Sequence, residues 1–283
     1  MSRLSTLDCR PATLRLTRLL RVRSWFGLAL MALGTAHAQI ELNFGLYRDP
    51  VLNQTIAPTP PTSLTPTIDP AFSTWRPDLE SFALADKLRR PEPGGVLFVG
   101  SSTIRLWREL EQHFRQQPVV INRGFGGSTL AACNFFAKEL VVQYRPAQVL
   151  VYAGENDLNI GRSPQDILES FSRFTETVRA ELPGVRISFI SIKPSPSRKA
   201  LLLLMQQTNR LIAGYIEKLP NAEYIDTHSA MLTAKGDPRP ELFQPDMLHL
   251  NDAGYALWQR IIEPHLGAKD AAASPAPPAS DKR

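Results

Sequence analysis

The chain has 283 residues, of which 43% are hydrophobic and 21% charged, with a formal net charge of +5 at pH 7. The whole excess comes from residues 1–38, which hold six arginines and one aspartate, so the remainder has a net charge of zero. This balance excludes a global electrostatic case for nucleic-acid binding, and the length allows one domain with a substantial core.

Residues 1–38 have the pattern of a secretory signal peptide. Six arginines precede the apolar run Trp25–Leu33, and Ala36-His37-Ala38 follows as a small-x-small cleavage site. A membrane anchor is the alternative, but the run falls short of the roughly 20 residues that cross a bilayer. We therefore expect an exported bacterial protein, periplasmic or secreted, without stable membrane insertion.

The cysteines fit this location. Cys9 leaves with the leader, so Cys133 is alone in the mature chain and no internal disulfide can form. An exported chain without disulfides suits the bacterial periplasm. Cys133 lies in an apolar helical pattern, which favours a buried small side chain over a nucleophile.

Composition divides the rest of the chain into three parts. Residues 39–71 are rich in Pro and Thr, which favours an extended segment over a packed core. Residues 72–266 form the expected folded domain. The Pro- and Ala-rich residues 267–283 are expected to be a disordered tail.

Within the domain, short apolar runs alternate with helical patterns. Continuous rather than alternating apolarity is typical of strands buried on both faces. Five runs are expected to be strands: Val96–Val99, Val119–Ile121, Val149–Tyr152, Ile187–Ile192 and Tyr224–Ile225. Helices are expected over residues 128–142, from Ser163 to the stop at Pro183-Gly184, over 197–219 and over 252–262.

Strands that alternate with helices predict an α/β protein with a parallel sheet covered on both faces, a three-layer α/β/α sandwich. In such sheets, ligands bind beyond the carboxyl ends of the strands. The residues that follow each strand are therefore the candidates for function.

The first strand ends in Gly100-Ser101-Ser102-Thr103. A buried strand that stops at a glycine and presents a hydroxyl before a helix is one way to hold a serine nucleophile open to substrate. Taken alone, the same residues are better explained as an ordinary strand-to-helix turn with a Ser or Thr cap.

Two further strand ends offer groups that could stabilise an oxyanion. Gly124, Gly126 and Gly127 follow the second strand, and such glycines leave backbone N–H groups open to an anion. The spacing differs from a Walker loop and no lysine follows, so a nucleotide site is a poor fit. Asn156 follows the third strand, where its neutral amide could donate hydrogen bonds, although an Asn turn explains it equally simply.

A possible base lies near the C-terminus. Asp246 precedes His249 by three residues, so the carboxylate can accept the imidazole N–H and fix the tautomer that makes His a base. Half of a metal site is an alternative, but few other His or Cys residues lie near strand ends. Asp226 and His228, after the fifth strand, form a competing pair.

Four sequence blocks carry these candidate residues: Gly100–Thr103, the glycines up to Gly127, Asn156, and the pair Asp246 and His249. These blocks, in this order, resemble the SGNH hydrolase superfamily, also called GDSL-type esterases and lipases. The resemblance runs from about Gly95 to Leu266, nearly the whole expected domain. It implies a flavodoxin-like sandwich with five parallel strands, which agrees with the number of apolar runs. One departure is Ser101, which stands where the common motif has an aspartate, as in the branch whose first block reads Gly-Ser-Ser.

The resemblance also implies roles for single residues. Ser102 would be the nucleophile, His249 the general base and Asp246 its orienting carboxylate. The oxyanion would be received by the N–H groups of Ser102 and Gly127 and by the Asn156 amide. The Lys193-Pro194-Ser195 segment after the fourth strand is only a candidate for the edge of the site.

The function implied is a serine esterase that acts on small-molecule or glycan esters, with short-acyl or carbohydrate-linked substrates preferred. No metal or organic cofactor is required by this chemistry. Two alternatives stay open: an O-acyltransferase that uses the same residues, and a catalytically silent binding module on the same fold.

Overall fold

The computed structural model describes residues 70–267 of the chain. The expected signal peptide, all but the last two residues of the expected extended segment and nearly all of the expected tail lie outside the described residues. The first described element, the 3-10 helix η1 (Pro70–Trp75), begins two residues before the expected start of the domain. No helix within residues 70–267 is long and apolar enough to cross a bilayer.

Five parallel strands form one sheet in the order β2-β1-β3-β4-β5, which is the flavodoxin-like order. The strands are β1 (Val96–Gly100), β2 (Val120–Gly124), β3 (Gln148–Tyr152), β4 (Arg186–Ile190) and β5 (Ala222–Ile225). The predicted α/β class and five-stranded parallel sheet are confirmed. The second strand extends to Gly124, beyond the expected end at Ile121.

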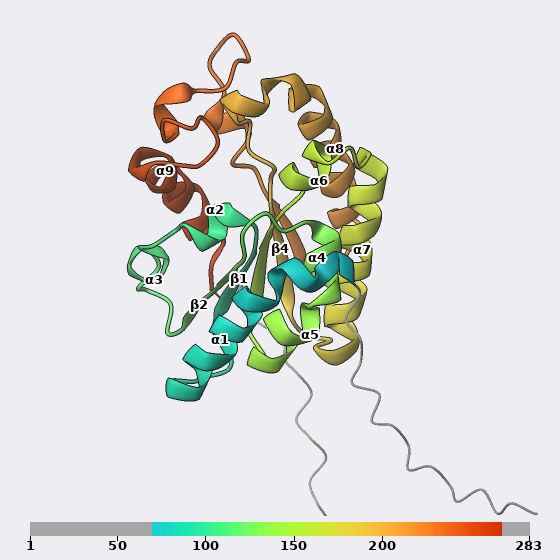
Figure 1. Cartoon of the computed structure of the whole chain (residues 1–283), viewed down its shortest axis with the longest axis vertical. Helices are drawn as coiled ribbons and strands as arrows, with labels where there is room; N and C mark the ends of the chain where they lie inside the picture. The colour runs from blue at the N-terminus through green and yellow to red at the C-terminus, as the bar shows by residue number, and fades with distance from the viewer. Residues whose placement is uncertain (1–69, 268–283) are drawn as a thin grey trace, which may run out of the picture. The chain divides into compact units, whose positions relative to one another are not determined.

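Helices pack against both faces of the sheet (Figure 1). The helices are α1 (Arg76–Leu88), α2 (Ser102–Arg105), α3 (Leu110–His113), α4 (Leu130–Phe135), α5 (Ala137–Leu140), α6 (Glu155–Asn159), α7 (Pro164–Glu181), α8 (Leu202–Ile216) and α9 (Asp252–Ile262). Short 3-10 turns complete the described elements: η2 (Val142–Tyr144), η3 (Pro196–Leu201), η4 (Ser229–Met231), η5 (Pro240–Leu242) and η6 (Glu263–His265).

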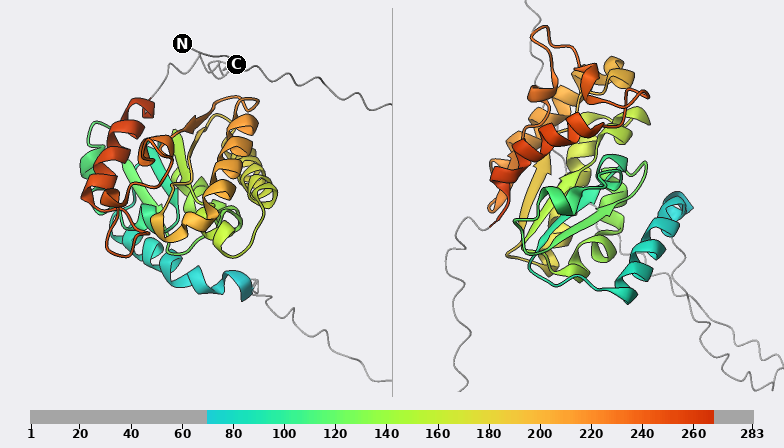
Figure 2. Two further views of the ribbon diagram at one scale, coloured as in Figure 1. Left: turned by 90° about the horizontal axis from the view of Figure 1, so that it is seen from above. Right: turned by 90° about the vertical axis from the view of Figure 1, so that its left-hand side faces the viewer.

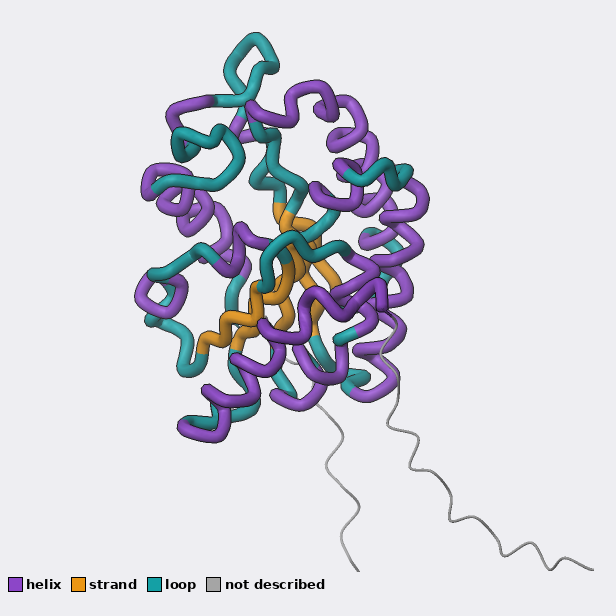
Figure 3. Tube along the Cα trace, in the orientation of Figure 1, coloured by secondary structure: helices purple, strands orange, loops and turns teal. Residues whose placement is uncertain are grey.

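Successive strand residues point to opposite faces, so each strand supplies two cores. Leu97 and Val99 of β1 face a core shared with α4, α5, α7 and α8, whereas Val96 and Phe98 face one shared with α9. Figure 2 shows α9 on one side of the sheet and α7 with α8 on the other. In Figure 3 the strands lie between these helical layers. The observed fold is therefore the predicted three-layer sandwich.

Two expected helices differ from the prediction. The segment 128–142 is broken into α4, α5 and η2, because Phe136 and Val141 leave the helical backbone region. The segment 197–219 opens as the 3-10 helix η3 and becomes α-helical only in α8. The patterns did not indicate α1, α3 or α6. By contrast, α7 begins as expected after Ser163, whose hydroxyl accepts a hydrogen bond from the Asp166 N–H in a capping box.

Candidate functional site

The carboxyl ends of the central strands lie at one level of the sheet. Gly100 of β1 pairs in register with Gly124 of β2 and with Tyr152 of β3. The residues that follow these strands therefore leave the sheet side by side. This register gathers the first three motif blocks at one edge.

Gly100 is the residue that makes the turn possible. Its φ is +142°, and a Cβ built on it would lie 1.8 Å from the Tyr152 carbonyl oxygen. The chain then bends close to β3, where the Ser101 N–H donates to the same carbonyl at 3.0 Å. Ser101 is buried, while Ser102, the first residue of α2, is partly exposed. The turn thus separates the two hydroxyls.

The structure brings Ser102, His249 and Asp246 into one chain of hydrogen bonds. The distance from Ser102 Oγ to His249 Nε2 is 3.1 Å, and that from His249 Nδ1 to Asp246 Oδ2 is 2.6 Å. With its Nδ1 proton directed at the carboxylate, the neutral ring presents Nε2 as an acceptor for the serine hydroxyl. This arrangement is the one that activates a serine.

The Asp246–His249 loop holds this geometry. Oδ1 of Asp246 accepts the N–H groups of Leu248 and His249 at 2.9 and 3.0 Å, and Met247, which follows Asp246, has a φ of +56°. Desolvation opposes ionisation, but these N–H groups and the His249 ring together lower the pKa of Asp246 to about 2. The carboxylate is therefore charged at neutral pH and faces the imidazole.

Three N–H donors that follow the ends of β1, β2 and β3 are free to bind a ligand within the described residues. Gly127 has a φ of +69°, and the N–H groups of Ser102 and Gly127 donate to no protein acceptor within the described residues. The Asn156 amide nitrogen donates one hydrogen to the Ser128 carbonyl at 3.0 Å, which leaves its second hydrogen. They belong to Ser102, Gly127 and Asn156, the residues for which the resemblance implies an oxyanion role.

Glu155, which precedes Asn156, belongs to a buried charged cluster with Lys193 and Ser195, the segment that was expected only as a candidate for the edge of the site. Lys193 Nζ contacts Glu155 at 2.5 Å and Ser195 Oγ at 2.6 Å, and Ser195 Oγ also donates to Glu155. Lys193 is 1% exposed, and burial lowers its pKa while the Glu155 carboxylate favours its charged form. Lys193 and Ser195 therefore support the loop after β3 from within the protein.

Asp157, which follows Asn156, links helix α6 to the start of helix α4. Its carboxylate accepts the Leu130 N–H at the start of α4, with distances of 3.0 and 3.3 Å to its two oxygens. Burial is the largest influence and raises its pKa to about 6, although the N–H groups of Leu130, Asp157 and Gly154 lower it. The contact holds the glycine loop before α4 against α6.

His228, the alternative candidate for the base, does not contact Ser102. His228 is buried with Nδ1 2.8 Å from the Ile192 carbonyl, and burial lowers its pKa. No contact joins it to Ser102 among the described residues. Cys133 is free and fully buried, as expected for a core residue. Trp107 is also a core residue, stacked on Tyr255, and Arg105 packs its guanidinium beside Gly126.

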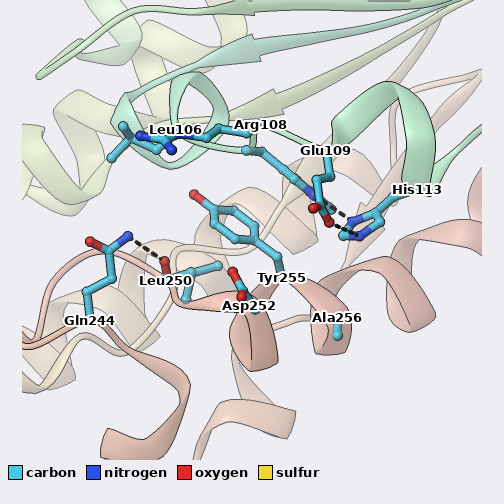
Figure 4. A pocket seen from close by; sticks show the side chains of 10 residues that line it. Leu106, Arg108, Glu109, His113, Gln244, Leu250, Asp252, Tyr255 and Ala256 are labelled. Carbon is cyan, nitrogen blue, oxygen red and sulfur yellow. Dashed lines mark hydrogen bonds and ion pairs between the residues drawn. The ribbon is translucent and has the colours of Figure 1, made fainter.

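A pocket of about 640 Å³ lies beside the segments that carry Ser102 and His249, although neither of these two residues lines it (Figure 4). Leu106, whose N–H donates to the Ser102 carbonyl at 2.8 Å, forms one wall, and Leu250, next to His249, forms the opposite one. In Figure 4, Tyr255 lies between these walls. The remaining lining residues are mostly polar or charged: Trp107, Arg108, Glu109, His113, Gln244, Asp252 and Ala256.

Within residues 70–267, no group of three or more His, Cys, Asp and Glu side chains is placed to hold a metal ion. The half metal site considered for Asp246 and His249 gains no third ligand there. Both side chains are instead engaged with each other and with Ser102.

The family described as GDSL-like Lipase/Acylhydrolase matches residues 97–257. That match spans more than half of the chain and includes Ser102, Gly127, Asn156, Asp246 and His249. No curated protein matches the chain in sequence.

Solved structures share the fold at low sequence identity. A Streptococcus pneumonia protein provisionally described as a platelet activating factor has a TM-score of 0.61 and 18% identity, over 68% of this chain and 92% of that one. A GDSL-like lipase from Bacteroides thetaiotaomicron has a TM-score of 0.57 and 19% identity, over 66% and 96%. A carbohydrate esterase of family 3 from Talaromyces cellulolyticus has a TM-score of 0.50 and 19% identity, over 60% and 94%.

Proposed function

The chain belongs to the GDSL-like lipase/acylhydrolase family, and on this basis we propose that it is a serine esterase that cleaves carboxylic esters through an acyl-enzyme on Ser102. The observation that carries the proposal is the continuous hydrogen-bond chain from Ser102 through His249 to Asp246, with distances of 3.1 and 2.6 Å. A serine without such a base is too weak a nucleophile for ester cleavage.

In the first half of the reaction, Ser102 Oγ bonds to the ester carbonyl carbon as its proton passes to His249 Nε2. The carbonyl electron pair moves onto oxygen, which becomes the oxyanion. When the bond to the alcohol oxygen breaks, His249 returns the proton to that oxygen and the acyl group stays on Ser102. Asp246 keeps the Nδ1 proton in place and stabilises the transient imidazolium.

The second half repeats these steps with water. His249 accepts a proton from the attacking water, whose oxygen bonds to the acyl carbon. The ester bond to Ser102 then breaks, and the proton returns to Ser102 Oγ with release of the carboxylic acid. In both halves the N–H groups of Ser102 and Gly127 and the Asn156 amide receive the oxyanion, and each such donor typically contributes about 100- to 1000-fold in rate.

For the substrate, we propose short-acyl or carbohydrate-linked esters. The support for this choice is that Arg108, Gln244 and Asp252, which line the pocket beside the segments carrying Ser102 and His249, can hydrogen-bond the hydroxyl groups of a sugar (Figure 4). The carbohydrate esterase from Talaromyces cellulolyticus shows that such chemistry occurs on this fold.

We also assign the chain to the branch whose first block reads Gly-Ser-Ser. Ser101 supports this assignment: it occupies the position of the usual aspartate, it is 3% exposed, and its backbone binds Tyr152. Ser101 therefore lies behind the turn rather than in the reaction.

The location that we propose is the periplasm or the medium, after cleavage at Ala38. The support is the basic and apolar pattern of residues 1–38. Expression of the full chain in a bacterium, followed by fractionation and N-terminal sequencing, tests it. A mature N-terminus at Gln39 in the periplasm or medium is expected, and an uncleaved cytoplasmic product would contradict it.

The proposed activity is tested with a series of chromogenic esters of increasing acyl length on wild type, Ser102→Ala and Ser101→Ala. We expect hydrolysis to be fastest for short acyl groups and to fall on the order of 10⁴-fold or more in Ser102→Ala. Ser101→Ala serves as the matched control and should remain active. Full activity in Ser102→Ala would refute the assignment of the nucleophile.

A further inference from the structure

Both oxyanion donors outside the nucleophile belong to amide groups, and each amide oxygen accepts a hydrogen bond from a distant side chain. Trp75 Nε1 donates to the Gly126 carbonyl at 2.8 Å. Arg198 Nη1 donates to Asn156 Oδ1 at 3.1 Å. The indole and guanidinium groups can only donate, so the contact with Arg198 identifies the oxygen of the Asn156 amide, and the contact with Trp75 fixes the direction of the Gly126 carbonyl.

In the first amide, the bond to Trp75 sets the direction of the Gly127 N–H. The Gly126 carbonyl and the Gly127 N–H belong to the same planar trans peptide, and they point in opposite directions. Two successive glycines would otherwise let this peptide rotate freely. A carbonyl fixed on the Trp75 side therefore presents the Gly127 N–H on the other side.

Trp75 is itself held in place. Its ring meets Phe125 edge-to-face with the centroids 6.0 Å apart, and it also contacts Phe72. Trp75 ends η1 and precedes the segment 97–257 that matches the family. The glycine loop thus receives its support from outside the motif blocks.

In the second amide, two contacts exclude a flipped side chain. The Asn156 oxygen faces the Arg198 guanidinium, and its nitrogen faces the Ser128 carbonyl at 3.0 Å. After a flip, two donors would meet at Arg198 and two acceptors at Ser128, and both hydrogen bonds would be lost. The nitrogen therefore stays on the Ser128 side with one hydrogen left over.

Arg198 is fixed by the loop between β4 and α8. Its guanidinium is mostly buried and lies 3.9 Å from Glu155, and its backbone N–H donates to Ser195. The adjacent Ser197 N–H donates to the Met247 carbonyl at 3.0 Å, within the loop that carries His249. One loop therefore contacts both the Asn156 side chain and the loop that carries the general base.

From these contacts we infer that Trp75 and Arg198 are positioning residues that orient the Gly127 N–H and the Asn156 amide toward the oxyanion. The inference rests on the proposed esterase function. A hydrogen bond to an amide oxygen also polarises the amide and strengthens its N–H as a donor, so each contact aids the transition state beyond its effect on geometry.

The test compares the kinetics of Trp75→Phe and Arg198→Met with those of wild type on a short-acyl chromogenic ester. Each variant removes the donor and keeps much of the side-chain volume. We expect kcat to fall about 10-fold in Trp75→Phe and about 10- to 100-fold in Arg198→Met, with KM nearly unchanged, because the oxyanion forms only in the transition state. Arg198→Lys, which retains a charged donor, should recover part of the loss.

Matched controls remove similar contacts away from the site. Trp258→Phe removes the contact of the Trp258 indole N–H with the Met231 sulfur. Arg179→Met removes the hydrogen bond from the Arg179 guanidinium to the Asn221 carbonyl. Both controls should keep wild-type kcat. Thermal unfolding of all variants identifies any loss that follows from instability, and Trp75→Phe, which keeps an aromatic ring, carries the test if Arg198→Met does not fold.

A double-mutant cycle separates positioning from a general structural effect. In an Asn156→Ala background, Arg198→Met should lower kcat by less than about 2-fold, because its target amide is absent. An undiminished further loss would overturn the role of Arg198, and wild-type kcat in folded Trp75→Phe would overturn that of Trp75. If wild type neither hydrolyses esters nor reacts with a fluorophosphonate, the proposed esterase function is refuted, and the positioning roles of Trp75 and Arg198 are refuted with it.

Discussion

The stability of the protein should depend on pH through Asp157, a buried carboxylate at the start of α4. The side chain is 2% exposed, accepts the Leu130 N–H, and has a pKa raised mainly by burial from 3.8 to about 6. A carboxyl whose pKa is higher in the folded state binds its proton more tightly there than in the unfolded chain. Its contribution to stability is therefore complete below pH 3.8 and is lost as the pH rises through about 6.

The size of this effect follows from the pKa difference of about two units. The full difference corresponds to on the order of 3 kcal/mol of unfolding free energy, of which about 2 kcal/mol falls between pH 4.5 and 7.5. For a domain of this size, about 2 kcal/mol shifts the midpoint of thermal unfolding by roughly 4–8 °C.

The assay is thermal unfolding of wild type and Asp157→Asn between pH 4.5 and 7.5. The amide of the variant can still accept the Leu130 N–H, but it does not titrate. We expect the wild type to lose about 2 kcal/mol of stability relative to the variant across this range. Asp166→Asn is the control, since Asp166 also lies at a helix start but is exposed, with its pKa lowered by the Ser163 N–H and hydroxyl.

The control should show no relative change between pH 5 and 7.5, because a lowered carboxyl pKa places its titration below that window. Parallel stability curves for wild type and Asp157→Asn would refute the reasoning. That result would mean that Asp157 is solvated or compensated in the folded protein.

Three further substitutions test the framework of the site. Gly100→Ala should prevent folding, because its Cβ would lie 1.8 Å from the Tyr152 oxygen, whereas Gly184→Ala, with open space around it, should give soluble protein of wild-type midpoint. Lys193→Met should cost on the order of 3–5 kcal/mol in urea unfolding by removing the closest cation from the buried Glu155, and a cost below about 1 kcal/mol would contradict the ion pair. His228→Gln should retain esterase activity, since His228 binds Ile192 rather than Ser102, and a loss of about 100-fold would reopen its role as base.

Features with local causes could be predicted from the sequence. The strand runs are apolar because both faces of the sheet are covered, and α7 begins at Ser163-Pro164 because the cap and the proline act on adjacent residues. The Gly-Ser-Ser junction was also readable, because a glycine directly after an apolar run marks the end of a strand, although the reason that Gly100 is required is its contact with Tyr152 of β3.

The breaks in the segment 128–142 had no such signal. Its buried residues Cys133, Ala137 and Leu140 keep helical spacing across the breaks, so the apolar pattern is the same with or without them. The breaks depend on the backbone angles of Phe136 and Val141.

The supports of the site were beyond sequence reasoning for a different reason. Trp75 meets Gly126 across 51 residues, Arg198 meets Asn156 across 42, and Lys193 meets Glu155 across 38. Each pair forms only when separate loops converge at the strand ends. The motif blocks indicated the reacting groups, whereas the groups that orient them depend on tertiary packing.

The central claim is that His249 activates Ser102 and no other serine. The most direct measurement is peptide mapping of the adduct that a fluorophosphonate forms with the mature protein. We predict a single adduct on Ser102 that is absent in Ser102→Ala. An adduct on Ser101, or an active enzyme without any serine adduct, would contradict the account.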